Sequence, residues 1–245
     1  MKILVCISKT PDTTAKIAFT DNNTKFAEAG VQWIINPYDE WYALVRAIEL
    51  KEADASTTIH LATVGGADAE PIIRKALALG GDEAHRVNAE PTESYFVAAQ
   101  LAAIAKGYDL VLLGKETIDY NGGAVGGMLA ELLDLPYIAN ATNLQIAGTT
   151  ATVKREIEGG EETIEVALPV VISCQKGMAE ARIPNMRGIM AARTKPLKVV
   201  EPANIEAMTQ YTSFQLPPAK AGVKLVSPDN VDELVRLLHE EARAI

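Results

Sequence analysis

The chain has 245 residues, of which 48% are hydrophobic and 22% are charged, and its formal net charge is −9. These proportions are those of an ordinary globular protein, and the excess of acidic residues argues against a nucleic-acid-binding surface, which needs clustered Lys and Arg. No apolar run approaches the length of a membrane span. The first residues form a strand pattern rather than a signal peptide, so we expect a cytoplasmic protein, or a matrix protein if a mitochondrial presequence has been removed.

Strand and helix patterns alternate through the first half of the chain. Short apolar runs that end at turn residues indicate buried strands, and apolar residues at helical spacing indicate helices between them. The Asp/Asn cluster at 21–24 indicates a hairpin within this series. The expected strands cover residues 3–8, 58–64, 84–87 and 110–114, and the helices cover about 37–50, 72–77, 93–105 and 124–133. This order predicts right-handed βαβ units in a doubly wound, mainly parallel α/β sheet.

The strand that ends at Gly114 leads into a glycine-rich loop, residues 117–123, and then into a helix. Such loops lie at the carboxyl edge of a parallel sheet, where uncovered backbone N–H groups at a helix N-terminus bind anions, most commonly phosphate. The alternative is purely structural: the loop glycines make a tight turn, and the glycines of the helix permit close packing. The glycine pattern alone leaves these two interpretations equal.

A second loop, at residues 36–40, precedes the first long helix. Asn36 suits a helix cap, Pro37 suits a first helical position, and Asp39 and Glu40 suit the positive end of the helix dipole. For the two acidic residues, this capping role is the better explanation.

Cysteine and histidine residues indicate neither a redox centre nor a metal centre. Cys6 and Cys174 lie inside strand patterns and are expected to be small buried apolar residues. His60, His85 and His239 are isolated from one another and from the cysteines, without the spacing of metal ligands. We therefore expect no metal site.

The second half of the chain changes character. Alternating residues on both sides of Gly159 and Gly160 predict an antiparallel hairpin with a glycine turn, and residues 169–174 resume a buried strand. Residues 181–193 combine Ile, Met and Arg around a Pro and a Gly, a composition typical of surfaces that bind other proteins. A loop that caps the core is the alternative for this segment.

The pattern of the last 50 residues, 196–245, predicts an arm rather than a folded domain. Residues 1–195 are expected to form the α/β domain, and residues 196–245 have little periodicity until a final amphipathic helix that begins near Ser227. An arm that ends in an amphipathic helix fits a partner subunit better than a monomer.

Several motifs together resemble the β subunit of electron transfer flavoprotein, in the expected order and over nearly the whole chain. The resemblance is specific because a Leu-Pro-Val strand follows the Arg-Glu-Ile-Glu-Gly-Gly hairpin. The motifs are Met1-Lys-Ile-Leu-Val-Cys-Ile, Ile35-Asn-Pro-Tyr-Asp-Glu, Leu112-Leu-Gly-Lys-Glu-Thr-Ile-Asp, Val153-Lys-Arg-Glu-Ile-Glu-Gly-Gly-Glu-Glu-Thr, Leu168-Pro-Val-Val-Ile-Ser and Arg182-Ile-Pro-Asn-Met.

This resemblance implies an adenine-nucleotide α-hydrolase-like fold, a non-catalytic electron carrier and a heterodimer with an α subunit. The α subunit holds most of the FAD, and the β subunit buries AMP. Electrons arrive from acyl-CoA and other flavin dehydrogenases of fatty acid β-oxidation and leave to a membrane quinone reductase. In bifurcating members a second FAD replaces AMP. The run Asp119-Tyr-Asn-Gly favours AMP, since bifurcating members carry Asp-Gly-Asp-Thr there.

Carried over by position, the resemblance also implies the site residues. Asn36 would bond the ribose or base, and the glycine loop would hold the phosphate through backbone N–H groups. Many relatives have hydroxyl or amide residues at 122–125, so this chain relies more on its backbone and leaves AMP versus FAD open. The implied nucleotide-binding residues are Cys6, Asn36, Pro37, Tyr38, Asp39, Val64, Gly114, Lys115, Asp119, Asn121, Gly122, Gly123, Ala124 and Val125.

Two further surfaces follow from the resemblance. Arg155 and Glu156 would face the flavin domain of the α subunit. A recognition loop would bind the dehydrogenase, with Ile183 as its apolar anchor. The loop residues are Arg182, Ile183, Pro184, Asn185, Met186, Arg187 and Met190.

Two other classes of protein fit less well. An ATP-cleaving adenylating enzyme needs a Ser-Gly-Gly-x-Asp-Ser loop after the first strand, where this chain has Ser8-Lys-Thr-Pro-Asp12, and no catalytic constellation converges elsewhere. A stress-type nucleotide-binding module has a different glycine spacing after Gly114 and lacks the long arm.

Overall fold

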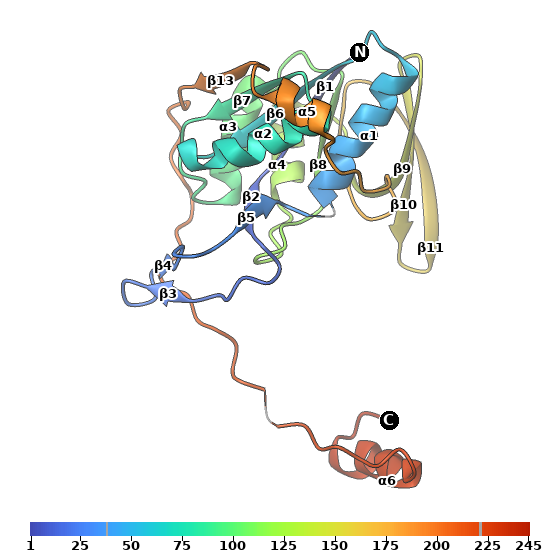
Figure 1. Cartoon of the computed structure of the whole chain (residues 1–245). Helices are drawn as coiled ribbons and strands as arrows, with labels where there is room; N and C mark the ends of the chain where they lie inside the picture. The colour runs from blue at the N-terminus through green and yellow to red at the C-terminus, as the bar shows by residue number, and fades with distance from the viewer. Residues whose placement is uncertain (38, 221) are drawn as a thin grey trace. The chain divides into compact units, whose positions relative to one another are not determined.

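The computed structural model describes residues 1–37, 39–220 and 222–245 (Figure 1). Contacts divide the chain into two compact units. The larger unit, here called the sheet domain, contains residues 1–16 and 27–212. The smaller unit, here called the tail unit, contains residues 17–26 and 213–245. No helix among the described residues has both the length and the apolar composition needed to cross a membrane.

A nine-stranded sheet forms the centre of the sheet domain, in the order β11-β10-β9-β12-β8-β1-β6-β7-β13. The pairs β11–β10 and β10–β9 are antiparallel. Every later pair in this spatial order, from β9–β12 to β7–β13, is parallel. The strands are β1 (Lys2–Cys6), β6 (Thr58–Val64), β7 (Glu83–Val87), β8 (Leu110–Gly114), β9 (Tyr137–Ala147), β10 (Thr150–Ile157), β11 (Gly160–Ala167), β12 (Val170–Cys174) and β13 (Leu197–Val200).

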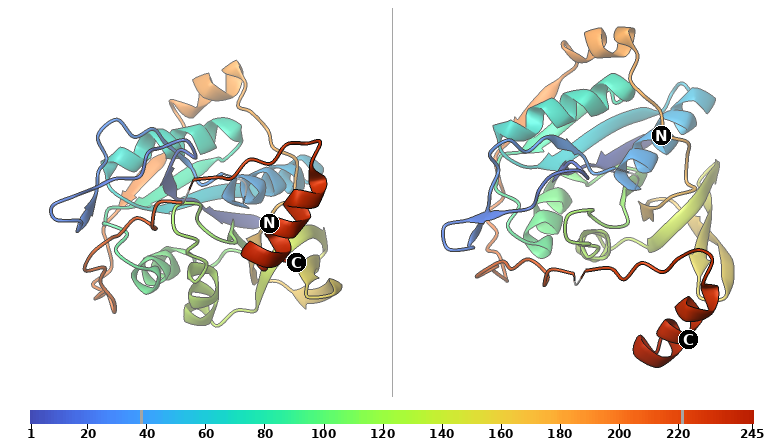
Figure 2. Two further views of the ribbon diagram at one scale, coloured as in Figure 1. Left: turned by 90° about the horizontal axis from the view of Figure 1, so that it is seen from below. Right: turned by 60° about the horizontal axis from the view of Figure 1, so that its bottom comes forward.

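Helices cover both faces of the parallel part of the sheet, as expected for a doubly wound fold (Figure 2). Apolar residues of α1, α2 and α5 pack on one face, and those of α3 and α4 pack on the other. The helices are α1 (Asp39–Ala53), η1 (Ala67–Ala69), α2 (Glu70–Leu79), α3 (Ser94–Ile104), α4 (Val125–Leu133) and α5 (Met186–Ala192). The predicted α/β class and its antiparallel hairpin are confirmed.

Two short pairings lie outside the expected pattern or at its edge. β2 (Lys9–Pro11) pairs with β5 (Trp33–Ile35) next to the end of β1. These runs are too short to show periodicity, so the sequence did not indicate them. β13 pairs in parallel with β7, although residues 196–245 were expected to form the arm.

The segment after β13 also stays with the sheet domain. The side-chain amide of Gln100 donates to the Ala203 carbonyl and accepts from the Ala203 N–H, each at 2.8 Å. The Glu93 carboxylate accepts from the Met208 N–H at 3.3 Å. The sheet domain therefore extends to Thr212, beyond the expected boundary at residue 195.

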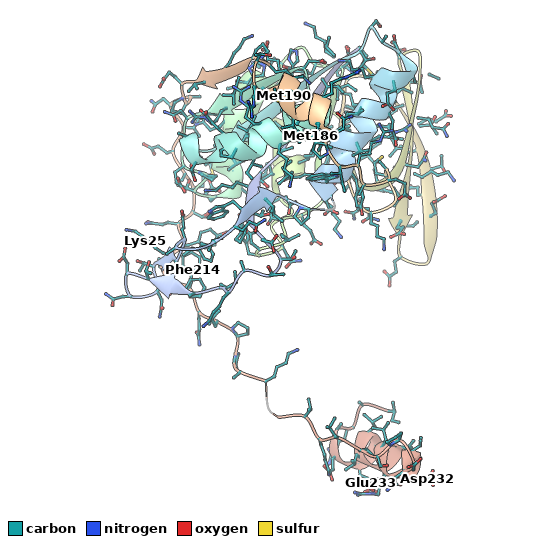
Figure 3. All side chains as sticks on the ribbon, viewed as in Figure 1. Lys25, Met186, Met190, Phe214, Asp232 and Glu233 are labelled. Carbon is teal, nitrogen blue, oxygen red and sulfur yellow. The ribbon has the colours of Figure 1, made fainter. Side chains whose placement is uncertain are left out.

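The tail unit contains the predicted hairpin and the predicted last helix. β3 (Phe19–Thr20) pairs with β4 (Lys25–Phe26), and the turn residues 21–23 all have positive φ, which Asp and Asn tolerate. Phe214 stacks on Phe19 with 5.3 Å between ring centroids (Figure 3). α6 (Val231–Arg236) continues into a π-helical turn, η2 (Leu237–Glu241).

Candidate functional site

The strand order places a crevice beside β1. From β1 the chain moves to β6 and β7 on one side, whereas β8 and β12 lie on the other. This is the switch point at which open α/β sheets bind ligands, beyond the carboxyl ends of the strands. Three predicted residues, Cys6, Val64 and Gly114, end three neighbouring strands at this edge.

Asn36 organises the loop at this edge. Its side chain is fully buried, with Nδ2 donating to the Glu116 carbonyl at 2.8 Å and Oδ1 accepting from the Ile118 N–H at 3.1 Å. These bonds tie Asn36 to the loop, and α1 begins only at Asp39, so the expected cap of α1 by Asn36 is wrong. Pro37 lies in the turn before α1 instead of at its first position, and Tyr38 lies outside the described residues.

The glycine loop closes on itself through Thr117. The Thr117 N–H donates to the Gly122 carbonyl at 3.1 Å, and the Thr117 hydroxyl accepts from the Gly122 N–H at 3.1 Å. Asn121 has a φ of +57°, and its N–H donates to the Thr117 carbonyl at 3.0 Å. Because the amides of Asn121 and Gly122 are used within the loop, the next amide donors along the chain are those from residue 123 onward.

The first turn of α4 supplies such donors. The helix begins at Val125 after Ala124, and no side chain caps it. The N–H groups of a first helical turn have no partner within the helix, and they attract anions together with the helix dipole. Gly126 lets α4 lie close to the sheet, since a Cβ there would be 2.7 Å from the Tyr137 hydroxyl. Gly126 therefore allows close helix packing in the same turn whose N–H groups are available to an anion.

Acidic side chains surround the loop. Asp39 Oδ2 accepts from the Glu116 N–H at 3.3 Å, and burial is the main cause of the raised pKa of Asp39. Lys115 pairs with Glu116 at 3.2 Å, and Asp119 Oδ1 accepts from the Tyr120 N–H at 3.0 Å. Carboxylates accept hydrogen bonds from ribose hydroxyls and base amino groups, whereas backbone amides suit a phosphate.

Glu40 is a buried acid at this edge whose role the sequence did not reveal. Its carboxylate accepts from the Ser8 N–H at 2.6 Å and from the Ser8 hydroxyl at 2.7 Å. The side chain therefore joins the first turn of α1, where it was expected, to the chain leaving β1, a contact that the sequence did not indicate. Burial raises the pKa of Glu40 to about 8, and the charge of Asp39 adds to the shift.

We expect the raised pKa of Glu40 to make folding pH-dependent. Between pH 4.5 and about 8 the folded chain holds a proton that the unfolded chain has lost. The free energy of unfolding therefore falls as pH rises through this window, with a slope of up to about 1.4 kcal/mol per pH unit. Denaturant unfolding of Glu40→Gln should show a smaller slope, and Glu131→Gln, at an exposed position of α4, should keep the original one. Equal slopes for the two variants would contradict the assignment.

The predicted recognition loop lies in residues 181–193, here called the docking segment. This segment displays apolar side chains on the surface. Ile183 is 90% exposed, and Met186 and Met190 on α5 are 72% and 55% exposed. Figure 3 labels the two methionines on this helix. Asn185 caps α5 by accepting from the Gly188 N–H at 2.8 Å. Soluble proteins rarely gather exposed apolar side chains without a partner surface. A core-capping loop does not fit these exposures.

Contacts with α1 and α2 hold the docking segment in place. Arg182 makes a bidentate ion pair with Glu52 at 2.7 and 3.0 Å, and the Trp41 indole donates to the Arg182 carbonyl at 3.0 Å. Gly188 approaches α2 so closely that a Cβ would be 2.2 Å from the Ala78 carbonyl oxygen. Arg182 thus positions the segment, and Ile183 projects from it.

The β10–β11 hairpin forms a third candidate surface. Arg155 pairs with Glu162 at 2.6 Å, and Glu156 accepts from the Gln175 side chain at 3.0 Å. A recess of about 450 Å³ opens beside these residues. It is lined by Asn140, Arg155, Glu156, Ile157, Glu158 and Gln175.

Comparisons with known proteins agree with this architecture. The family model described as "Electron transfer flavoprotein domain" matches residues 23–205. The chain is 41% identical to the electron transfer flavoprotein subunit beta of Syntrophomonas wolfei, over 92% of this chain and 90% of that protein. It is 39% identical to the corresponding subunit of Bacillus subtilis over the full length of both.

A subunit of a larger reductase complex is also similar to this chain. The chain is 31% identical to subunit CarD of the caffeyl-CoA reductase–Etf complex of Acetobacterium woodii, over 96% of this chain and 95% of that protein. The family match covers most of the chain, and these relatives align over nearly their whole length. The chain therefore belongs to the electron transfer flavoprotein family, as a β subunit.

Proposed function

We propose that the chain binds AMP in the crevice beside β1 and works as the β subunit of a heterodimer that carries electrons on FAD. The supporting observation is the uncapped first turn of α4 at the switch point of the sheet. Backbone amides from Gly123 to Val125 face the phosphate, and Asp39 and Asp119 supply acceptors for the nucleoside. Asn36 acts through the loop that it holds.

The loop chemistry favours a mononucleotide with a single phosphate group. The acidic side chains at this edge, Asp39, Glu116 and Asp119, have Lys115 beside them as a cation. A diphosphate would add negative charge next to these carboxylates, and like charges at short range destabilise one another. The alternative is a second FAD in place of AMP, which fits the similarity to a subunit of the caffeyl-CoA reductase–Etf complex.

The partners follow from the other two surfaces. We infer that the recess beside the hairpin faces the flavin domain of the α subunit, with Arg155 and Glu156 at its rim. The exposed Ile183, Met186 and Met190 bind acyl-CoA and other flavin dehydrogenases, and a membrane quinone reductase accepts the electrons. Because the anchor tethers the partner, the flavin stays at high effective concentration while its domain moves.

The nucleotide content of the heterodimer tests this proposal. After co-expression with an α subunit and denaturation in acid, the released nucleotides are separated by chromatography. We expect one FAD and one AMP per heterodimer. Two FAD and no AMP would select the bifurcating alternative. FAD without any second nucleotide would contradict a nucleotide site in this chain.

A direct variant links the nucleotide to α4. Gly123→Val should lower the bound AMP per heterodimer, because a Cβ at residue 123 would be 3.1 Å from the Lys115 carbonyl oxygen and would displace the loop. Gly160→Val, at a hairpin position where a Cβ meets only open space, is the matched control for glycine replacement and should keep its AMP. Full AMP content in Gly123→Val would argue against donors from residue 123 onward.

A further inference from the structure

Two histidines that are far apart in the sequence meet on neighbouring strands. In the parallel register of β6 and β7, His60 lies opposite Glu83, and His85 follows two residues later on the same face as Glu83. The ring centroids of His60 and His85 are 5.5 Å apart. His85 Nε2 lies 3.2 Å from Glu83 Oε1. The expectation that these histidines are isolated is therefore wrong.

We propose that His60, Glu83 and His85 form a binding site for a divalent transition-metal ion, with Zn²⁺ as the best fit. One ligand atom from each residue lies within 4.8 Å of the others. Ligands of one tetrahedral zinc ion are roughly 3.3 Å apart, given Zn–N bonds of about 2.0–2.1 Å. Small rotations of three half-buried side chains close this difference. Two imidazoles and a carboxylate are a zinc-binding set that leaves a fourth position for water.

The histidine environments favour metal binding. Burial lowers the pKa of both His60 and His85, which favours the neutral ring that coordinates metals. His60 Nδ1 lies 2.7 Å from the Tyr108 hydroxyl, which orients the ring and leaves Nε2 as the ligand. Among the described residues, the buried His85 Nε2 has no hydrogen-bond partner with acceptable geometry. A metal ion would satisfy this nitrogen.

Lys198 competes with the metal ion for the carboxylate. Its ammonium lies 2.5 Å from Glu83 Oε1, and its side chain is 59% exposed. The Lys198 side chain can therefore move into water when a cation of higher charge arrives. An ion-pair network of Lys198, Glu83 and His85 without any metal is the competing explanation. It predicts that removal of Lys198 will not tighten zinc binding.

The cluster is separate from the nucleotide crevice. His60 is the third residue of β6 and Glu83 is the first residue of β7, whereas the crevice lies beyond the carboxyl ends of the strands. Metal binding here would thus not require the nucleotide. It would join β6 to β7 and, by releasing Lys198, loosen the contact of β13 with Glu83.

Calorimetric titration with ZnCl₂ tests the site in the full chain, co-expressed with its α subunit and freed of metal by a chelator. We expect the double variant His60→Gln/His85→Gln to lose one zinc equivalent per heterodimer. His239 is the third and last histidine of the chain, so His239→Gln is the matched control and should retain that equivalent. Tyr108→Phe should weaken zinc binding by about tenfold, because it removes the group that orients His60.

Removal of Lys198 gives the discriminating result. Lys198→Ala should bind zinc severalfold more tightly than the original chain, which damage to the fold would not produce. Bound Co²⁺ should show visible absorption bands that vanish in the double histidine variant. The proposal is overturned if that variant, with an unchanged melting temperature in the absence of metal, takes up as much zinc as the original chain. Weaker binding by Lys198→Ala would also overturn it.

Discussion

Ile183→Ala should reduce the rate at which an acyl-CoA dehydrogenase passes electrons to the heterodimer by about thirtyfold or more. The side chain is 90% exposed in the free chain, and the segment beneath it is held by the Arg182–Glu52 ion pair and the Trp41 hydrogen bond. An apolar anchor on a rigid support inserts into a partner pocket with little loss of conformational entropy. Loss of such an anchor typically costs about 2 kcal/mol or more, which corresponds to roughly thirtyfold.

The measurement is the initial rate of FAD reduction at several heterodimer concentrations, reported as kcat/KM. The FAD content should stay unchanged, because Ile183 lies outside the nucleotide crevice and the hairpin recess. Val199→Ala is the matched control, since Val199 is a β-branched apolar residue that is 51% exposed on β13. Rates for Ile183→Ala within twofold of the original would rule out this residue as the anchor.

Gly188→Ala should displace α5 and abolish dehydrogenase docking together with part of the stability. A Cβ at residue 188 would be 2.2 Å from the Ala78 carbonyl oxygen, and this atom belongs to the backbone of α2, so it cannot rotate away. Overpacking of a rigid contact costs about 1–3 kcal/mol, and this overlap is at the upper end. For a chain of this size, about 3 kcal/mol lowers the melting temperature by roughly 6–12 °C.

A second glycine provides the control for this prediction. Gly127 also lies in a helix, but a Cβ there would meet the Tyr137 ring at 3.6 Å, which is ordinary contact. Gly127→Ala should therefore be neutral or stabilising by about 0.5–1 kcal/mol, because Ala favours helix. Hydrogen exchange of residues 182–192 localises the effect. Unchanged protection and stability in Gly188→Ala would show that α5 does not depend on this close approach.

The docking segment shows why part of a site cannot be predicted from its residues. The mixture of Ile, Met and Arg at 181–193 indicated a protein-binding surface, and the exposures of Ile183, Met186 and Met190 agree with that interpretation. Arg182, however, was grouped with the docking residues, whereas its guanidinium is bound to Glu52. A sequence shows which residues carry charge, but the partner of each charge depends on which helices pack together.

The sequence by itself determined the α/β class, the hairpins, the glycine loop after Gly114 and the apolar segment around Ile183, because these depend on local periodicity and on turn chemistry. Only the tertiary structure decided what depends on contacts between distant residues. In the folded chain, Asn36 binds the loop after β8 instead of capping α1, and Glu40 is buried against Ser8. The sheet gains β13, and His60 lies beside His85. In each of these cases, strand pairing or helix packing brings together segments that are far apart in the sequence. Hydrophobic periodicity indicates local secondary structure and does not indicate which distant segments will meet.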